Sequence, residues 1–91
     1  MLASWPQFDA DQIDAATRVL ASGKVNTWTG QETTAFEQEY AQWCCATHAI
    51  AMANGSLALS AAYLAMGLGP GDELITTPRT FIATASSAVL L

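Results

Sequence analysis

Two short segments of the chain carry residue types that could together hold a flat, phosphorylated ligand. The first is Asn54-Gly55-Ser56-Leu57, which lies between a run of apolar residues and a stretch expected to be helical. The N-terminus of a helix offers unpaired amides and the positive end of the helix dipole, and both favour a phosphate. Gly55 would let the backbone approach closely, and Ser56 adds a hydroxyl. The alternative is a plain turn in which Ser56 caps the helix.

The second segment is Pro78-Arg79-Thr80-Phe81, which lies at the carboxyl end of a strand predicted over residues 72–77. In open α/β sheets, ligands bind outside the carboxyl ends of the strands. An aromatic side chain at such a place could stack on the flat ring of a ligand, and Phe81 is the candidate. The alternative is that Phe81 belongs to the hydrophobic core, where phenylalanine is often buried.

A change of pattern after residue 47 predicts that an α/β unit positions both segments. Residues 48–53 are a short apolar run suited to a strand buried on both faces, and residues 72–77 predict a second strand. Between them, residues 56–66 predict a buried helix, and residues 80–91 predict a further helix that begins at a threonine cap. A strand–helix–strand unit of this length implies a right-handed crossover and a parallel pair of strands.

Two helices are predicted ahead of this unit. Asp9 and Gln12 have the spacing of a capping box, and Gly23 marks the end of the first helix. Thr29 and Glu32 repeat the capping-box spacing, which predicts a second helix from there to about residue 45. We therefore expect residues 1–47 to form a helical segment and residues 48–91 to begin a large α/β domain with a mostly parallel sheet.

One face of the second helix is expected to be buried, because Phe36, Tyr40, Trp43 and Cys44 recur at helical spacing. Cys44 and Cys45 are also expected to act as small buried groups, since a disulfide ring between neighbouring cysteines is strained. No disulfide framework is predicted, which fits a reducing compartment. Residues 1–8 lack the basic and apolar regions of a signal peptide, so a cytoplasmic location is expected.

The composition excludes several classes of function. Eight acidic residues against three basic ones give a net charge of −5, which argues against binding to nucleic acid or to an anionic membrane surface. The single histidine, His48, leaves too few ligands for a Cys/His zinc site. Between Tyr40 and Gly71 there is no charged residue, and 52% of the chain is hydrophobic. This is the composition of an interior, so the chain is expected to be a piece of something larger.

Five short motifs resemble one protein family. Asn-Gly-Ser-Leu-Ala-Leu, Gly-Leu-Gly-Pro-Gly-Asp-Glu-Leu-Ile and Thr-Pro-Arg-Thr-Phe-Ile-Ala-Thr-Ala lie within residues 53–88, and Trp-Thr-Gly and Phe-Glu-Gln-Glu-Tyr-Ala lie upstream. They are similar to the N-terminal region of the sugar aminotransferases of the DegT/DnrJ/EryC1/StrS family. The resemblance covers almost the whole chain.

That resemblance implies the type I aminotransferase fold, pyridoxal 5′-phosphate as cofactor, and a homodimer with active sites at the subunit interface. It also implies amino transfer from glutamate to a nucleotide-linked keto-sugar, in the biosynthesis of amino sugars for cell-surface polysaccharides. By motif, Gly55, Ser56 and the amide of Leu57 match the positions that hold the cofactor phosphate, and Phe81 matches the aromatic residue that stacks on the pyridine ring. Trp28 and Thr29 fall near the loop that lines the sugar-nucleotide site.

The catalytic centre is expected to be incomplete. The family forms its Schiff base with a lysine far downstream, whereas Lys24 is the sole lysine of this chain and follows a helix stop. No residue of the chain is therefore assigned a catalytic role, and the chain alone is expected to be inactive. The alternative is a small non-catalytic α/β module that binds a phosphorylated ligand or a partner subunit.

Overall fold

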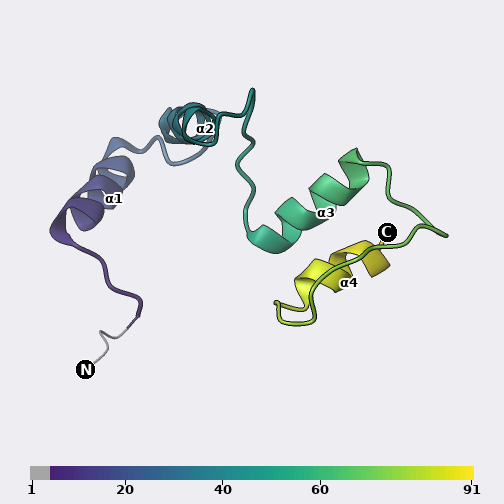
Figure 1. Ribbon diagram of the computed structural model, residues 1–91. Helices are drawn as coiled ribbons and strands as arrows, with labels where there is room; N and C mark the ends of the chain where they lie inside the picture. Colours follow the sequence, from purple (N-terminus) through teal and green to yellow (C-terminus); the bar gives the residue numbers. More distant parts are fainter. Residues whose placement is uncertain (1–4) are drawn as a thin grey trace. The chain divides into compact units, whose positions relative to one another are not determined.

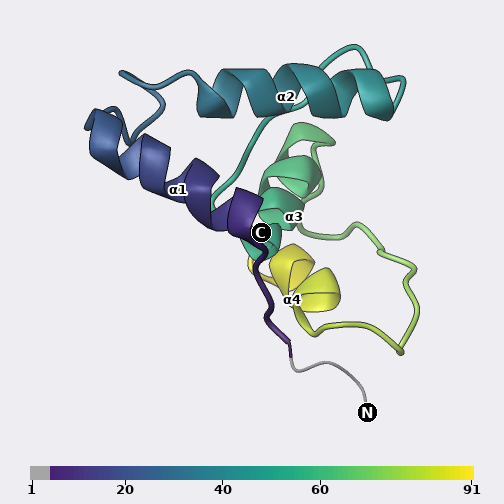
Figure 2. The ribbon, with the colours of Figure 1, turned by 90° about the vertical axis from the view of Figure 1, so that its left-hand side faces the viewer.

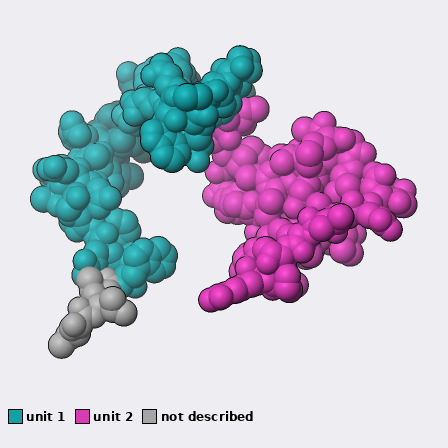
Figure 3. All heavy atoms as spheres, viewed as in Figure 1, with its two compact units in different colours: residues 1–49 teal, residues 50–91 magenta. Residues whose placement is uncertain are grey.

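The computed structural model describes residues 5–91, and the chain divides into two compact units, Met1–Ala49 and Ile50–Leu91 (Figures 1 and 3). Unit 1 contains helices α1 (Ala10–Ser22) and α2 (Glu32–Trp43). Unit 2 contains helices α3 (Gly55–Ala65) and α4 (Ala83–Val89). The four predicted helices are thus confirmed in kind and order, although α2 and α4 begin later than expected.

Both ends of α1 are fixed by the residues that the sequence indicated. The Asp9 carboxylate accepts a hydrogen bond from the Gln12 amide at 2.9 Å, and the Gln12 side chain accepts one from the Asp9 amide at 3.0 Å. Gly23 ends the helix in the left-handed region at φ 69°, a conformation that glycine adopts without steric cost. The predicted capping box and helix stop are therefore confirmed.

The predicted cap of α2 is wrong. The helix begins after Gln31, whose side chain makes no capping bond. Thr29 is engaged elsewhere, because the side-chain oxygen of Asn26 accepts hydrogen bonds from the Trp28 amide at 3.0 Å and from the Thr29 amide and hydroxyl at 3.1 Å each. An asparagine that binds the backbone just after it forms a turn. That turn delays the helix beyond Thr29.

The aromatic face of α2 is exposed, contrary to the prediction that it is buried. The rings of Phe36 and Tyr40 lie 5.5 Å apart and those of Tyr40 and Trp43 lie 5.7 Å apart, so these side chains pack along their own helix. Ala41 is the buried residue of α2. Cys44 and Cys45 are exposed and free, which corrects the expectation that they are buried. The hydrogen bond with the Cys44 thiol, followed by electrostatic interaction with it, raises the pKa of Tyr40.

Unit 2 is held together by the packing of α4 against α3 (Figure 2). Tyr63 of α3 is buried, as are Ala83 and Ser87 of α4. The Tyr63 hydroxyl donates a hydrogen bond to the Thr84 carbonyl at 2.9 Å, and the Ser87 hydroxyl donates a longer one to the Ser56 carbonyl at 3.4 Å. These two bonds join residues 21 and 31 positions apart, so they fix the tertiary arrangement of the unit.

The expected strands do not form within residues 5–91. Residues 48–53 and 72–77 make no β-ladder, and Ile50 and Ile75 are 79% and 97% exposed. A strand exists only through hydrogen bonds to a neighbour, and no other segment of the described chain supplies them. For the same reason α3 is not packed on a sheet as predicted, and Leu57, Leu64 and Met66 remain exposed. None of the helices described here is both long and apolar enough to cross a membrane.

The last helix also differs from its prediction. Thr80 does not cap it as predicted, because α4 begins at Ala83 after Ile82, and Ile82 makes no side-chain capping bond. The Thr80 hydroxyl lies 3.0 Å from the hydroxyl of Thr84. Thr80 therefore contacts the Thr84 side chain in the first turn of α4, and residues 81–82 lie between Thr80 and the start of the helix.

The capping box at α1 gives a direct test of the fold. Replacing Asp9 by Ala removes the acceptor for the Gln12 amide and should lower helix stability by about 1 kcal/mol. Urea unfolding followed by circular dichroism measures this change. Asp9→Asn is the matched control, because it keeps an oxygen acceptor and should retain most of the stability. Equal losses in the two variants would contradict the capping role.

Candidate functional site

The N-terminus of α3 is capped by Asn54. Its backbone is extended, and its side-chain oxygen accepts a hydrogen bond from the Leu57 amide at 3.0 Å. Ser56 lies inside the first helical turn, so the alternative that Ser56 is the cap is wrong. The Ser56 carbonyl accepts hydrogen bonds from the hydroxyls of Ser60 at 3.2 Å and Ser87 at 3.4 Å.

The donors at this helix end fit a phosphate group. The first amides of a helix have no partner within it, so Gly55 and Ser56 direct theirs out of the helix end. The exposed Ser56 side chain adds a hydroxyl next to them. A Cβ added to Gly55 would meet nothing within 4 Å, so the space in front of the backbone is open at this point. The Leu57 amide, in contrast, is already bonded to Asn54.

Phe81 lies in the loop that leads into α4, and its side chain is 73% exposed. The alternative that it belongs to the core is therefore wrong for this structure. Its carbonyl accepts a hydrogen bond from the Thr84 amide at 3.1 Å, which makes the loop continuous with the first turn of α4. The ring is open to stacking against a flat ligand.

The four candidate cofactor residues, Gly55, Ser56, Leu57 and Phe81, all belong to unit 2. The packing of α4 on α3 connects them, because Ser87 bonds to Ser56 and Tyr63 bonds to the turn that follows Phe81. A hollow of about 280 Å³ in the same unit is lined by other residues, among them Asp72, Leu74 and Ala88. The candidate residues thus form an open surface and do not line that hollow.

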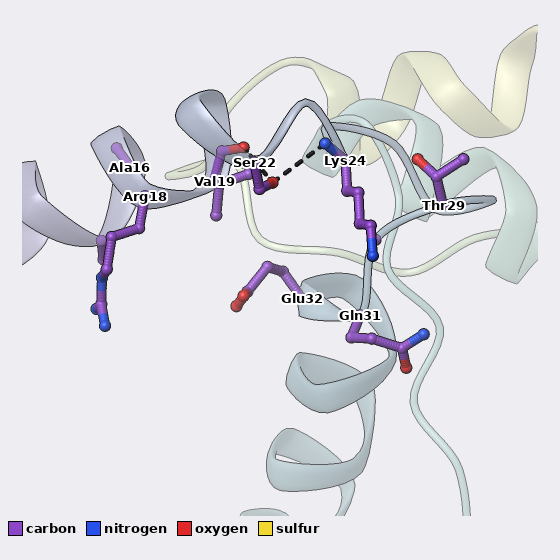
Figure 4. A pocket seen from close by; sticks show the side chains of 10 residues that line it. Ala16, Arg18, Val19, Ser22, Lys24, Thr29, Gln31 and Glu32 are labelled. Carbon is purple, nitrogen blue, oxygen red and sulfur yellow. Dashed lines mark hydrogen bonds between the residues drawn. The ribbon is translucent and has the colours of Figure 1, made fainter.

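Trp28 and Thr29, the candidate substrate residues, lie in unit 1. Trp28 is 96% exposed, and Asn26 fixes the backbone of both residues. Thr29 lines a hollow of about 600 Å³ between the second half of α1 and residues 29–32 (Figure 4). Trp28 does not line it.

Charged side chains from two elements line the same hollow. Arg18 and Lys24 come from the end of α1 and the segment after it, and Glu32 comes from the start of α2. In the view of Figure 4, the carboxylate of Glu32 lies between the two cations. The Lys24 amide donates to the Ser22 hydroxyl at 3.1 Å, so the helix stop also fixes the backbone from which Lys24 extends.

Sequence reasoning missed the residues that hold the candidate residues in place. Asn26 and Asn54 could have been found, because each precedes a turn or helix start and asparagine binds backbone amides at such positions. Tyr63 and Ser87 carry no such signal, since their partners lie far along the chain. No group of three or more potential metal ligands occurs within the described part of the chain.

The fold and motifs of the chain match a known family of transferases. The sequence model of the DegT/DnrJ/EryC1/StrS aminotransferase family matches residues 6–91. The chain therefore belongs to this family.

Individual relatives agree with that assignment. The chain is 39% identical over 85 residues to 3-amino-5-hydroxybenzoate synthase of Amycolatopsis mediterranei, covering 93% of this chain and 22% of that protein. It is 38% identical over 82 residues to GDP-perosamine synthase of Caulobacter vibrioides, covering 90% of this chain and 22% of that protein. The chain thus spans about a fifth of the length of these curated relatives.

A solved structure shows the same fold. The chain is similar to the aminotransferase from Psychrobacter cryohalolentis, with a TM-score of 0.93 and 52% sequence identity. The match covers 99% of this chain and 23% of the chain of that aminotransferase.

The Trp-Thr-Gly turn offers a test of the loop geometry. A Cβ at Gly30 would lie 2.7 Å from the Lys24 carbonyl oxygen and 3.0 Å from the Asn26 carbonyl oxygen, so Gly30→Ala should force the loop open. We expect altered amide chemical shifts across residues 24–31 and faster exchange of the Gly30 amide, measured by NMR. Gly69→Ala is the control, because a Cβ there meets nothing within 4 Å. A Gly30→Ala spectrum as little changed as that of the control would contradict the loop structure.

Proposed function

We propose that this chain forms the phosphate- and ring-binding part of the cofactor pocket of a pyridoxal 5′-phosphate-dependent aminotransferase. The observation that carries the proposal is the presence, in one unit of a chain from this family, of an open helix N-terminus at Ser56 and an exposed aromatic ring at Phe81. An anion-binding helix end and a stacking ring are the two contacts that a phosphorylated pyridine requires.

The chain's own residues would divide the work of binding. The amides of Gly55 and Ser56 and the Ser56 hydroxyl would donate to the phosphate, whose negative charge the α3 dipole favours. The Leu57 amide would also donate to the phosphate once its hydrogen bond to the Asn54 side chain is broken. The Phe81 ring would stack on the pyridine and keep it from tilting. When bound, the cofactor supplies the electron sink for amino transfer.

The proposed substrate is a nucleotide-linked keto-sugar, with glutamate as the amino donor. The support is the name of one relative, GDP-perosamine synthase, which refers to a GDP-linked compound. Another relative, 38% identical over 86 residues, is the spore coat polysaccharide biosynthesis protein SpsC of Bacillus subtilis, which supports a product destined for a cell-surface polysaccharide. Trp28 and Thr29 would contact the substrate, since Trp28 presents a whole ring to solvent.

In the proposed enzyme, residues 48–91 begin the large domain. The segments 48–53 and 72–77 would become strands of its sheet when neighbouring strands supply hydrogen bonds. The active form would be a cytoplasmic homodimer, and the free thiols of Cys44 and Cys45 suit a reducing compartment. The 91-residue chain alone would be inactive, because Lys24 belongs to unit 1 and lines a hollow remote in sequence from Ser56 and Phe81.

The cofactor proposal is tested by binding without covalent chemistry. 4-Deoxypyridoxine 5′-phosphate keeps the ring and phosphate but has no aldehyde to react with lysine. Ser56→Ala should weaken its binding to the chain about tenfold, because a hydrogen bond to a charged group contributes roughly 1.5 kcal/mol or more. Phe81→Ala should weaken it about three- to tenfold through lost stacking, since the exposed ring leaves no cavity behind. NMR titration measures both affinities.

The control is Phe36→Ala, an exposed aromatic residue of unit 1 that should not affect binding. Unchanged affinity in both Ser56→Ala and Phe81→Ala would overturn the cofactor proposal. Loss of binding in Ser56→Ala alone would favour the second candidate function, a non-catalytic module that recognises only a phosphate. That candidate is favoured by the combination of an open α3 N-terminus and a unit 2 without lysine.

Lys24 should not act as the cofactor's covalent partner. After mixing with pyridoxal 5′-phosphate and reduction with borohydride, mass spectrometry should find only sub-stoichiometric, unsaturable labelling of Lys24 and the N-terminal amine. Surface labelling of this kind is expected of any exposed amine, so a Lys24→Arg variant serves as the blank for the Lys24 peptide. A saturable, stoichiometric adduct on Lys24 would contradict the prediction.

A further inference from the structure

Tyr63 is a buried tyrosine whose hydroxyl serves a segment other than its own helix. Its side chain is 7% exposed, and the hydroxyl donates a 2.9 Å hydrogen bond to the Thr84 carbonyl. Burying a phenol requires such a partner, and a phenylalanine would fill nearly the same volume without that requirement. The hydroxyl therefore has a specific structural effect, which is to hold Thr84 against α3.

Thr84 in turn holds the loop that carries Phe81. The Thr84 amide donates to the Phe81 carbonyl at 3.1 Å, and the hydroxyls of Thr84 and Thr80 lie 3.0 Å apart. Phe81 and Thr80 are thus both bonded to Thr84, the residue whose carbonyl accepts the hydrogen bond from Tyr63. Tyr63, Thr84 and Phe81 form a continuous series of hydrogen-bonded groups.

The position of the Phe81 ring depends on this series because the ring has little packing of its own. With 73% of the side chain exposed, its neighbours cannot fix its place, and the backbone that carries it must do so. Tyr63 lies on α3, the same helix whose first turn contains Ser56. The bond from Tyr63 to Thr84, whose amide bonds to the Phe81 carbonyl, therefore sets the ring contact relative to the phosphate contact.

We propose that Tyr63 is a positioning residue that, through Thr84, fixes Phe81 for stacking on the cofactor ring. The inference rests on the proposed function, because it assumes that Ser56 and Phe81 contact one ligand. When the Phe81 ring is already held in place before the ligand binds, binding loses less conformational entropy, and the affinity is higher. The role belongs to the Tyr63 hydroxyl alone, so Tyr63→Phe removes it and keeps the packing of the Tyr63 ring.

The test compares two probes in the full 91-residue chain and its Tyr63→Phe variant. The first is 4-deoxypyridoxine 5′-phosphate, which uses both contacts, and the second is inorganic phosphate, which uses only the helix end. Tyr63→Phe should weaken the first about three- to tenfold, the usual effect of one lost hydrogen bond. It should leave the affinity for inorganic phosphate unchanged. NMR titration of each probe gives the two constants.

A thermodynamic cycle separates positioning from general loosening. If Tyr63 acts through Phe81, adding Tyr63→Phe to Phe81→Ala should cause no further loss of affinity. Ser87→Ala is the matched control for the α3 and α4 packing, because it removes the other bond between these helices. Tyr40→Phe makes the same chemical change in unit 1 and should have no effect.

The outcomes distinguish this inference from the function on which it rests. Binding that depends on Ser56 and Phe81 but not on Tyr63 overturns the inference alone. Additive losses, or equal weakening of both probes, also overturn it. A wild-type chain that does not bind the ring probe overturns both proposals. If Tyr63→Phe disturbs the fold by circular dichroism, Thr80→Val replaces it, since it loosens the same loop from an exposed position and should give the same ring-specific loss.

Discussion

The hydrogen bond from the Tyr63 hydroxyl to the Thr84 carbonyl is the short side-chain link between the helices of unit 2. α4 has only 7 residues, too few to be stable as an isolated helix in water. It is ordered by its contact with α3, where Ala83 and Ser87 are buried. The loop that carries Phe81 continues into α4, so its place also follows from this packing. The candidate cofactor surface is therefore a product of tertiary structure and not of local motifs alone.

The features that the sequence predicted correctly are those whose partners lie within one helical turn. The capping box of Asp9 and Gln12 and the stop at Gly23 each need only residues three or fewer positions away. The start of α2 was mispredicted because two local interactions compete for Thr29, and the turn around Asn26 prevails. Hydrogen bonds that cross from one helix to another, such as that of Ser87, leave no periodic trace in the sequence.

The expected strands are absent within residues 5–91, and the expected buried face of α2 is exposed, for a related reason. Hydrophobic patterning indicates which residues avoid water but not which segment covers them. Residues 48–53 and 72–77 are predicted to be strands, yet no neighbour pairs with them among the residues that the structure describes. The same applies to the row of Phe36, Tyr40 and Trp43. The start of α3 was nevertheless predictable, since an Asn-Gly-Ser turn before an apolar stretch indicates a helix N-terminus from local chemistry alone, and that α3 binds an anion there remains a prediction.

Asn54 gives the N-terminus of α3 a hydrogen-bond acceptor that belongs to the chain itself. Its side-chain oxygen accepts a hydrogen bond from the Leu57 amide, as an oxygen of a bound anion would. A phosphate that reached the same amide would have to displace that oxygen, so binding there would be an exchange and not an addition. The net affinity would then reflect the difference between two hydrogen bonds to one donor. Because Asn54 caps the helix with its own side chain, the first turn of α3 does not need an anion in order to form.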